Sequence, residues 1–284
     1  MLSRILVPVR GDGMGEVVLS HAAILAHNHN AHIVVAHCRP LPQEYLPYGV
    51  PLPAFARKTI LQQSAQLSDQ EEAGLRDKLH DVAQKLDLTE TESPDGSRAT
   101  VQYVEETGRM MDVVRHNGRL ADLIVVAKPD RDRNLGTNTL KAGLFQTGRP
   151  VLMCPPMSEP PADFGARIAI AWNGSLEAAR MVALTLDLIG TAKTVTILSG
   201  GKGAVHGATT EELVGYYAHR GVTASVRRFD ANNPGQSLID KAKEADAQLL
   251  LMGAYGVSHE RETLFGGNTQ AVVDNADLPV VMAH

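Results

Sequence analysis

The sequence is poor in cysteine and has no long apolar run. Only two of its 284 residues are cysteine, Cys38 and Cys154, and each stands at the end of a short apolar run. Such a pair favours buried thiols in a reducing compartment over a disulfide. No apolar stretch approaches the roughly 20 residues that cross a bilayer. The apolar run in the opening MLSRILVPVRGDG is too short for a signal peptide. We therefore predict a cytoplasmic protein without a membrane segment.

Basic runs and the common catalytic motifs are also absent from the sequence. The formal net charge is -5 and no segment concentrates lysine or arginine, so we expect no nucleic-acid partner. There is no Gly-x-x-x-x-Gly-Lys-Ser/Thr loop, which argues against a conventional P-loop kinase or motor. There is no Gly-x-Ser-x-Gly motif, which argues against a nucleophile elbow. No positioned general base or pair of metal-binding carboxylates is evident, and we predict no catalytic or metal-ligating residue.

What the chain does contain is an internal repeat. RILVPVRGDG from Arg4 parallels RIAIAWNGS from Arg167, and each reads as an apolar strand followed by a glycine turn and a helix. Further along, ADLIVVAKPD parallels AQLLLMGAYG, and GRPVLMCPP parallels DLPVVMAH. The proline-rich PPMSEPPADFG between the two copies is typical of a linker. We predict two tandem domains, residues 1–158 and 164–284.

Strand patterns alternate with helix patterns in both halves. In the second half we expect strands at 167–172, 194–198, 222–229, 248–253 and 279–283, and helices at 176–189, 209–220, 235–245 and 267–275. Parallel neighbours need crossover helices. The predicted fold class is therefore α/β, with two doubly wound domains. Each has a five-stranded parallel sheet in the order 3-2-1-4-5 and helices on both faces. In the first half a proline-rich loop and a long helix at about 54–86 follow the second strand.

The segment MGAYGVSHERETLFGGNT, residues 252–269, places four glycines around one loop directly after an apolar strand. In the order 3-2-1-4-5 this loop emerges beside the end of strand one, where such sheets bind ligands. Its first two glycines, Gly253 and Gly256, let the backbone approach a ligand closely. Its last two begin a helix together with Thr269, and the free N–H groups of a helix start favour phosphate. The alternative is that the glycines are only turns and caps.

The loop resembles the nucleotide-binding signature of the universal stress protein family, which is Gly-x-x-Gly, nine residues, Gly, then Ser or Thr. Gly253, Gly256 and Gly266 match this spacing, whereas Gly267 departs from it at the Ser/Thr position. Thr269 matches a second hydroxyl position that often contacts phosphate in the family. The resemblance covers both halves, so the chain looks like a tandem member.

The end of strand one adds to this resemblance. Family members usually carry Asp before Gly-Ser there, and this sequence has Asn173-Gly174-Ser175, in which Asn keeps the shape and loses the charge. The resemblance implies that the second domain binds ATP or a related adenine nucleotide, which Mg²⁺ could accompany. It implies a binding set made of Asn173, Gly174, Gly253, Gly256, Gly266, Gly267, Asn268 and Thr269.

The first half lacks the corresponding glycines. Ala127 stands for Gly253 and Asp130 for Gly256, and the loop is shorter. We predict that this half does not bind nucleotide in the family manner. The resemblance also implies that the last strands of the halves, Val151–Met153 and Val280–Met282, pair to form an intrachain pseudo-dimer. A homodimer of whole chains is an additional option.

Two questions stay open at this stage. The histidines His27, His29 and His32 are close enough in sequence to suggest a metal site, but solvated side chains at a helix end are the preferred interpretation. The leading function is a stress-response sensor or regulator that binds ATP. The alternatives are a slow ATPase or nucleotide-processing enzyme, and a dimerisation scaffold that binds no nucleotide.

Overall fold

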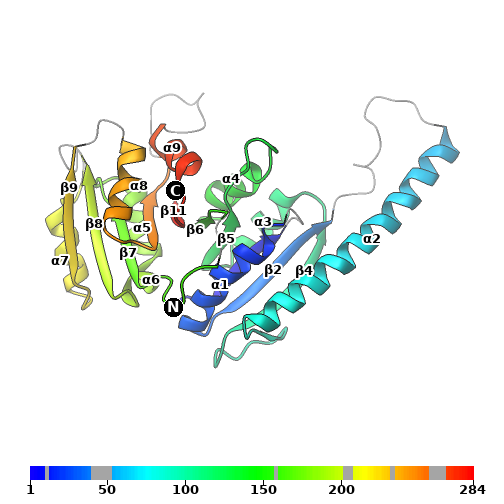
Figure 1. The fold of residues 1–284 in the computed structure, drawn as a ribbon, viewed down its shortest axis with the longest axis horizontal. Helices are drawn as coiled ribbons and strands as arrows, with labels where there is room; N and C mark the ends of the chain where they lie inside the picture. The colour runs from blue at the N-terminus through cyan, green and yellow to red at the C-terminus, as the bar shows by residue number, and fades with distance from the viewer. Residues whose placement is uncertain (10–12, 40–52, 157–158, 201–206, 231–233, 256–266) are drawn as a thin grey trace.

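We describe the protein from a computed structural model, for residues 1–9, 13–39, 53–156, 159–200, 207–230, 234–255 and 267–284. These residues form one 11-stranded sheet with helices on both of its faces (Figure 1). The sheet order is β3-β4-β2-β1-β5-β6-β11-β10-β7-β8-β9. Each half therefore contains the order 3-2-1-4-5, as the sequence pattern predicts.

The elements of the first half follow the predicted alternation of strands and helices. They are β1 (Arg4–Val9), α1 (Gly15–His29), β2 (His32–Arg39), α2 (Ala54–Lys85), β3 (Thr89–Glu90), β4 (Thr100–Thr107), α3 (Met110–Gly118), β5 (Leu123–Ala127), α4 (Thr137–Gln146) and β6 (Val151–Cys154). The two-residue strand β3 is an addition to the five expected strands, and it extends the sheet beyond β4.

The second half contains its five expected strands. The elements are β7 (Arg167–Ala171), α5 (Leu176–Leu184), α6 (Leu186–Gly190), β8 (Thr194–Gly200), α7 (Thr210–Ala218), β9 (Ala224–Phe229), α8 (Pro234–Glu244), β10 (Leu249–Gly253), α9 (Gly267–Asn275) and β11 (Val280–Ala283). The single helix expected at 176–189 is divided at Thr185, whose hydroxyl donates to the Met181 carbonyl at 2.7 Å. A threonine that bonds back to the preceding turn competes with regular helix geometry.

The two halves join edge to edge. Strand β6 pairs with β11 in antiparallel register, with Leu152 opposite Val281, while the neighbouring strands within each described half are parallel. This is the pairing that the sequence comparison implies. It places the junction in the middle of the sheet rather than at a surface of helices.

The hydrophobic core consists of two layers, and both run through both halves. One layer lies between the sheet and α1, α2, α5, α6 and α7, and the other lies under α3, α4, α8 and α9 (Figure 1). At the junction, side chains alternate between the layers, so Leu152 and Val281 point to the first and Met153 and Met282 to the second. The continuous apolar strands are buried on both faces, as parallel sheets covered by helices require.

Helix α2 extends away from the body of the molecule (Figure 1). Its last turns pack on the core through Leu79, Val82 and Ala83, whereas Phe55 near its start is 75% exposed. Neither cysteine forms a disulfide; Cys154 is buried and Cys38 is half-buried, with its thiol donating to the Gly108 carbonyl. Among the described residues, no helix is long and apolar enough to cross a bilayer.

Candidate functional site

The carboxyl ends of β7 and β10 lie side by side, because these strands pair in parallel with Ile170 opposite Leu251. This is the point at which strand order reverses in the second half, since β8 and β9 lie on one side and β11 lies on the other. Doubly wound sheets bind their ligands at such a point. The candidate site is therefore built from the chain that follows β7 and the chain that follows β10.

The turn after β7 is held by its own polar groups. The Asn173 Oδ1 accepts a hydrogen bond from the Ser175 N–H at 3.1 Å, and Gly174 has φ of 72°, which favours glycine. Ser175 then caps α5, with its hydroxyl accepting from the Ala178 N–H at 3.2 Å. Asn173 itself is exposed, so its amide group can contact a ligand at the start of this helix.

A neighbouring segment that the sequence patterns do not reveal covers this turn. Gly207, at φ of 154°, lies so close that a Cβ at this position would collide with the Gly174 carbonyl. Beside it, the Trp172 indole N–H donates to the Ala208 carbonyl at 3.0 Å. Gly207 and Ala208 therefore lie against this side of the candidate site. The sequence signal for this contact is only one glycine among several.

Gly253, at the end of β10, is a glycine for reasons of packing. A Cβ at this position would lie 2.5 Å from the Ala178 N and 2.6 Å from the Glu177 carbonyl carbon, both in the first turn of α5. Real Cβ atoms essentially never approach other atoms this closely. The glycine therefore lets α5 sit directly against the strand end, and this role is independent of any ligand.

The end of β10 and the start of α9 are tied together. Tyr255 has a left-handed backbone, with φ of 56°, and its N–H donates to the Thr269 Oγ1 at 3.2 Å. Thr269 is buried, whereas Gly267 and Asn268 are exposed at the beginning of the helix. Among the described residues, no atom lies within 4 Å of a Cβ built on Gly267. Backbone N–H groups in the first turn of a helix have no partner within the helix.

The structure thus brings six of the eight predicted residues to one edge of the sheet, and the other two, Gly256 and Gly266, lie outside the described residues. The six are Asn173, Gly174, Gly253, Gly267, Asn268 and Thr269. Two helix N-termini, those of α5 and α9, begin at this edge. Helix N-termini favour anions, because their unpaired N–H groups carry partial positive charge.

The family profile described as "Universal stress protein family" matches the sequence twice, over residues 1–136 and 166–284. The chain belongs to the universal stress protein family. No curated protein matches the chain.

Solved structures of universal stress proteins have the same fold. One from Archaeoglobus fulgidus DSM 4304 is similar with a TM-score of 0.71 and 13% identity, and covers 100% of this chain and 98% of its own. A candidate universal stress protein from Pseudomonas aeruginosa UCBPP-PA14 gives a TM-score of 0.57 and 17% identity, covering 99% of this chain and 93% of its own. These likenesses show the fold alone.

A further Archaeoglobus fulgidus universal stress protein is in complex with dAMP. The match covers 42% of this chain and 97% of that protein's chain, with 18% identity and a TM-score of 0.33. The likeness is too low to transfer that ligand to this chain.

In this universal stress protein, the carboxyl ends of β1 and β5 are the first half's counterpart of the candidate site. The carboxyl ends of β1 and β5, with Met14, Gly15 and Thr139, surround a space of only about 10 Å³ among the described residues. Asp130 forms a bridge to Leu135 that closes the short loop on itself. That the first half does not bind nucleotide in the family manner stays a prediction.

Two of the three histidines considered for a metal site bond to separate partners. The His27 Nε2 lies 2.8 Å from the Leu86 carbonyl oxygen, and the His32 Nδ1 lies 2.9 Å from the Thr100 Oγ1. Within the described part of the chain, no three histidine, cysteine or acidic side chains gather in a group that could hold a metal ion.

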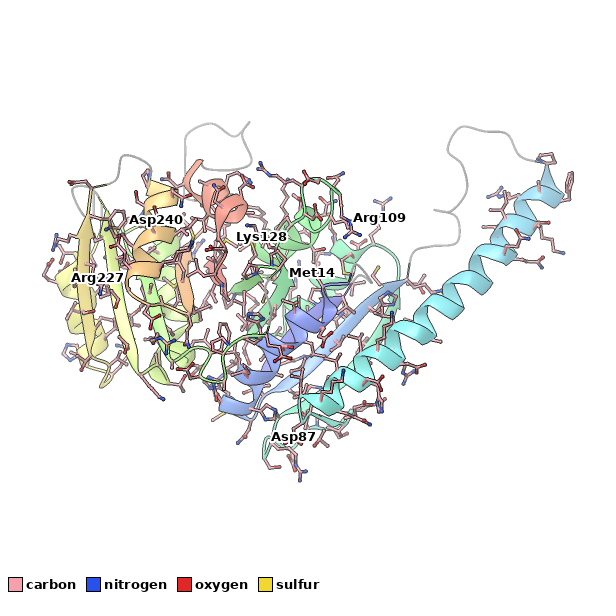
Figure 2. The ribbon with its side chains drawn as sticks, in the orientation of Figure 1. Met14, Asp87, Arg109, Lys128, Arg227 and Asp240 are labelled. Atoms are coloured by element: carbon pink, nitrogen blue, oxygen red, sulfur yellow. The ribbon has the colours of Figure 1, made fainter. Side chains whose placement is uncertain are left out.

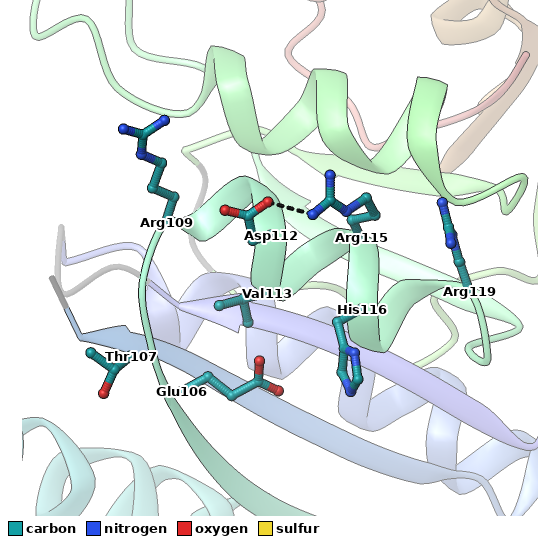
Figure 3. A pocket seen from close by; sticks show the side chains of 8 residues that line it. All are labelled: Glu106, Thr107, Arg109, Asp112, Val113, Arg115, His116 and Arg119. Carbon is teal, nitrogen blue, oxygen red and sulfur yellow. Dashed lines mark hydrogen bonds and ion pairs between the residues drawn. The ribbon is translucent and has the colours of Figure 1, made fainter. Parts of the chain in front are cut away.

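A separate concave surface of about 360 Å³ lies beside α3 in the first half (Figure 3). Three arginine side chains reach out on the same side of the helix, and Arg115 is paired with Asp112 at 2.7 Å. The residues that line it are Glu106, Thr107, Arg109, Asp112, Val113, Arg115, His116 and Arg119. Sequence patterns do not reveal this surface, because charges at helical spacing are typical of any solvated helix face.

Proposed function

We propose that the second half binds ATP or a related adenine nucleotide, and that the protein acts as a stress-response sensor or regulator. The observation that carries the proposal is the meeting of two helix N-termini with a glycine turn at the point where strand order reverses. This combination offers backbone N–H donors and close backbone approach, the two requirements for holding a polyphosphate.

Each residue has a distinct role in the proposal. Asn173 and Gly174 contact the adenosine part, and the loop from Gly253 through Gly256 leads to the phosphates. Gly266, Gly267, Asn268 and Thr269 hold the phosphates through N–H groups and a hydroxyl. The Thr269 oxygen already accepts from Tyr255, so its own proton is what remains to donate to phosphate.

Gly267 offers a test that separates binding from folding. It is exposed at the first position of α9, with room for a side chain among the described residues. Gly267→Asp places a carboxylate at a helix N-terminus, which favours the helix by about 0.3–1 kcal/mol. The same carboxylate repels phosphate by about 1–3 kcal/mol at about 5 Å, or roughly 5- to 150-fold in Kd. We expect unchanged or higher stability together with weaker binding.

The matched control is Thr137→Asp, which alters the first position of α4 in the first half. Binding is followed by the fluorescence of Trp172, the single tryptophan, which is buried beside the site. We expect the control to bind ATP like the unaltered protein. Absence of any ATP response in the unaltered protein would favour the scaffold alternative. Phosphate release that stops in Gly267→Asp would favour the ATPase.

A further inference from the structure

Two segments of the first half contact the helix α9 and the turn after β10, which border the candidate nucleotide site of the second half. The first is the short loop after β5, which occupies the place of the glycine loop. The Lys128 Nζ donates to the Ala276 carbonyl at 2.8 Å, and the Arg131 guanidinium pairs with Asp274 at 2.7 Å (Figure 2 labels Lys128 beside α9). Both partners lie at the carboxyl end of α9, where cations are favourable because the helix carries partial negative charge there.

The second contact lies at the turn between β10 and the loop. Phe145 of α4 packs against Tyr255, with ring centroids 5.1 Å apart, and against His284, at 4.9 Å with nearly perpendicular rings. The His284 Nδ1 in turn lies 3.1 Å from the Ala254 carbonyl oxygen. Tyr255 is the residue whose N–H bonds to Thr269 at the start of α9. The first half thus contacts both the turn and the far end of the helix.

We infer that the first half is a brace that positions the nucleotide site of the second half, an inference that rests on the proposed function. The pair Arg131–Asp274 and Lys128 hold one end of α9, and Phe145 holds the turn to which its other end is bonded. The loop after β5, which lacks the glycines, therefore has a role in the tandem chain as a support for α9. These residues are positioning residues, because they contact the helix and the turn rather than the ligand.

The brace raises nucleotide affinity by restricting the conformations that α9 and the turn adopt in the protein without nucleotide. A site that is correctly arranged for only part of the time binds with an apparent Kd raised by the inverse of that fraction. Removing one contact of the brace lowers this fraction. We expect nucleotide binding to weaken by up to about 5-fold when the partly exposed ion pair is lost, and by about 2- to 12-fold when the aromatic contact is lost.

The first experiment reverses the ion pair in the whole chain. Arg131→Asp places a second carboxylate opposite that of Asp274, and the two repel each other. The double variant with Asp274→Arg restores an attractive pair. The matched control is Arg115→Asp, which breaks the exposed pair with Asp112 inside the first half. ATP affinity is measured by titration, and amide hydrogen exchange of Tyr255 is measured without nucleotide. The Tyr255 amide reports directly on the bond between the turn and α9.

The second experiment removes the aromatic contact. Phe145→Ala is compared with Phe55→Ala, which truncates an exposed phenylalanine near the start of α2. Exchange at Leu250, whose amide bonds to the Pro279 carbonyl in the core, shows whether the whole fold is intact. We expect faster exchange at Tyr255 and unchanged exchange at Leu250 in Phe145→Ala. We expect no change at either amide in the control.

The two readouts separate the inference from the proposed function. Faster Tyr255 exchange with weaker binding in both interface variants, and recovery in the charge-swapped double variant, would support the brace. Unchanged Tyr255 exchange and unchanged affinity in both interface variants would overturn it. If no form of the protein binds ATP, the proposed function fails. The exchange data still decide whether the first half holds α9 and the turn in place.

Discussion

Replacing Gly253 by alanine should destabilise the fold even when no nucleotide is present. The added Cβ would lie 2.5 Å from the Ala178 N, and ordinary contacts begin at 3.4 Å, so α5 or β10 must shift by about 1 Å. Both are backbone elements of a packed core and neither can rotate out of the way. Overpacking of this kind costs about 1–3 kcal/mol. Reduced backbone freedom of the unfolded chain offsets about 0.5–1 kcal/mol of that.

The matched control for this prediction is Gly215→Ala, in the interior of α7. No described atom lies within 4 Å of a Cβ at Gly215, so alanine adds helix propensity without a collision. We expect a gain of about 0.5–1 kcal/mol there. Urea unfolding, followed by Trp172 fluorescence and by circular dichroism, gives both free energies. Equal stability of the two alanine variants would refute the packing argument. The result also matters for binding studies, because lost nucleotide binding in a Gly253 variant is not evidence of ligand contact.

Two further predictions concern titratable side chains. Burial lowers the pKa of His21 from its ordinary 6.5, so below that pH the unfolded chain takes up a proton that the folded chain does not. The free energy of unfolding should therefore fall as pH falls below about 6.5, and His21→Leu should reduce that slope by up to about 1.4 kcal/mol per pH unit in denaturant titrations. An unaltered slope in His21→Leu would contradict this assignment. Burial also raises the pKa of the Cys154 thiol, whereas Cys38 is half-buried, so a thiol reagent should modify Cys38 alone in the native protein and both residues after unfolding. Modification of Cys154 at the rate of Cys38 would show that the core opens at that strand.

The sequence pattern predicts the sheet well because its strands are fully buried and apolar. Leu249–Met252 and Val280–Met282 are continuously apolar, which predicts neighbouring strands in a sheet covered on both faces, and these strands pair in parallel. The two-residue strand β3 could not be predicted, since Thr89 and Glu90 are exposed and polar and their pairing depends on the neighbouring β4.

The sequence predicts where the candidate site lies, but it only partly predicts why each residue is needed there. The position of Gly253 at the carboxyl end of β10 follows from strand order, but its contact with α5 does not, because helix packing distances are not encoded in spacing. The same holds for Gly207, which meets Gly174 across 33 positions of sequence. The contact between Phe145 and Tyr255 requires knowing that two halves join through β6 and β11.

Joining the halves through β6 and β11 leaves the sheet with only two outer edges in the described part of the chain, β3 and β9. Neither is a good template for adding another strand. Strand β3 has two residues, and β9 carries two adjacent arginines, Arg227 and Arg228 (Figure 2 labels Arg227). The Arg227 guanidinium donates to the Glu244 carbonyl, and the Arg228 guanidinium forms an ion pair with Glu211. Short and charged edges resist strand addition. The tandem arrangement therefore completes the sheet within one chain, and neither described edge favours its extension by a second copy.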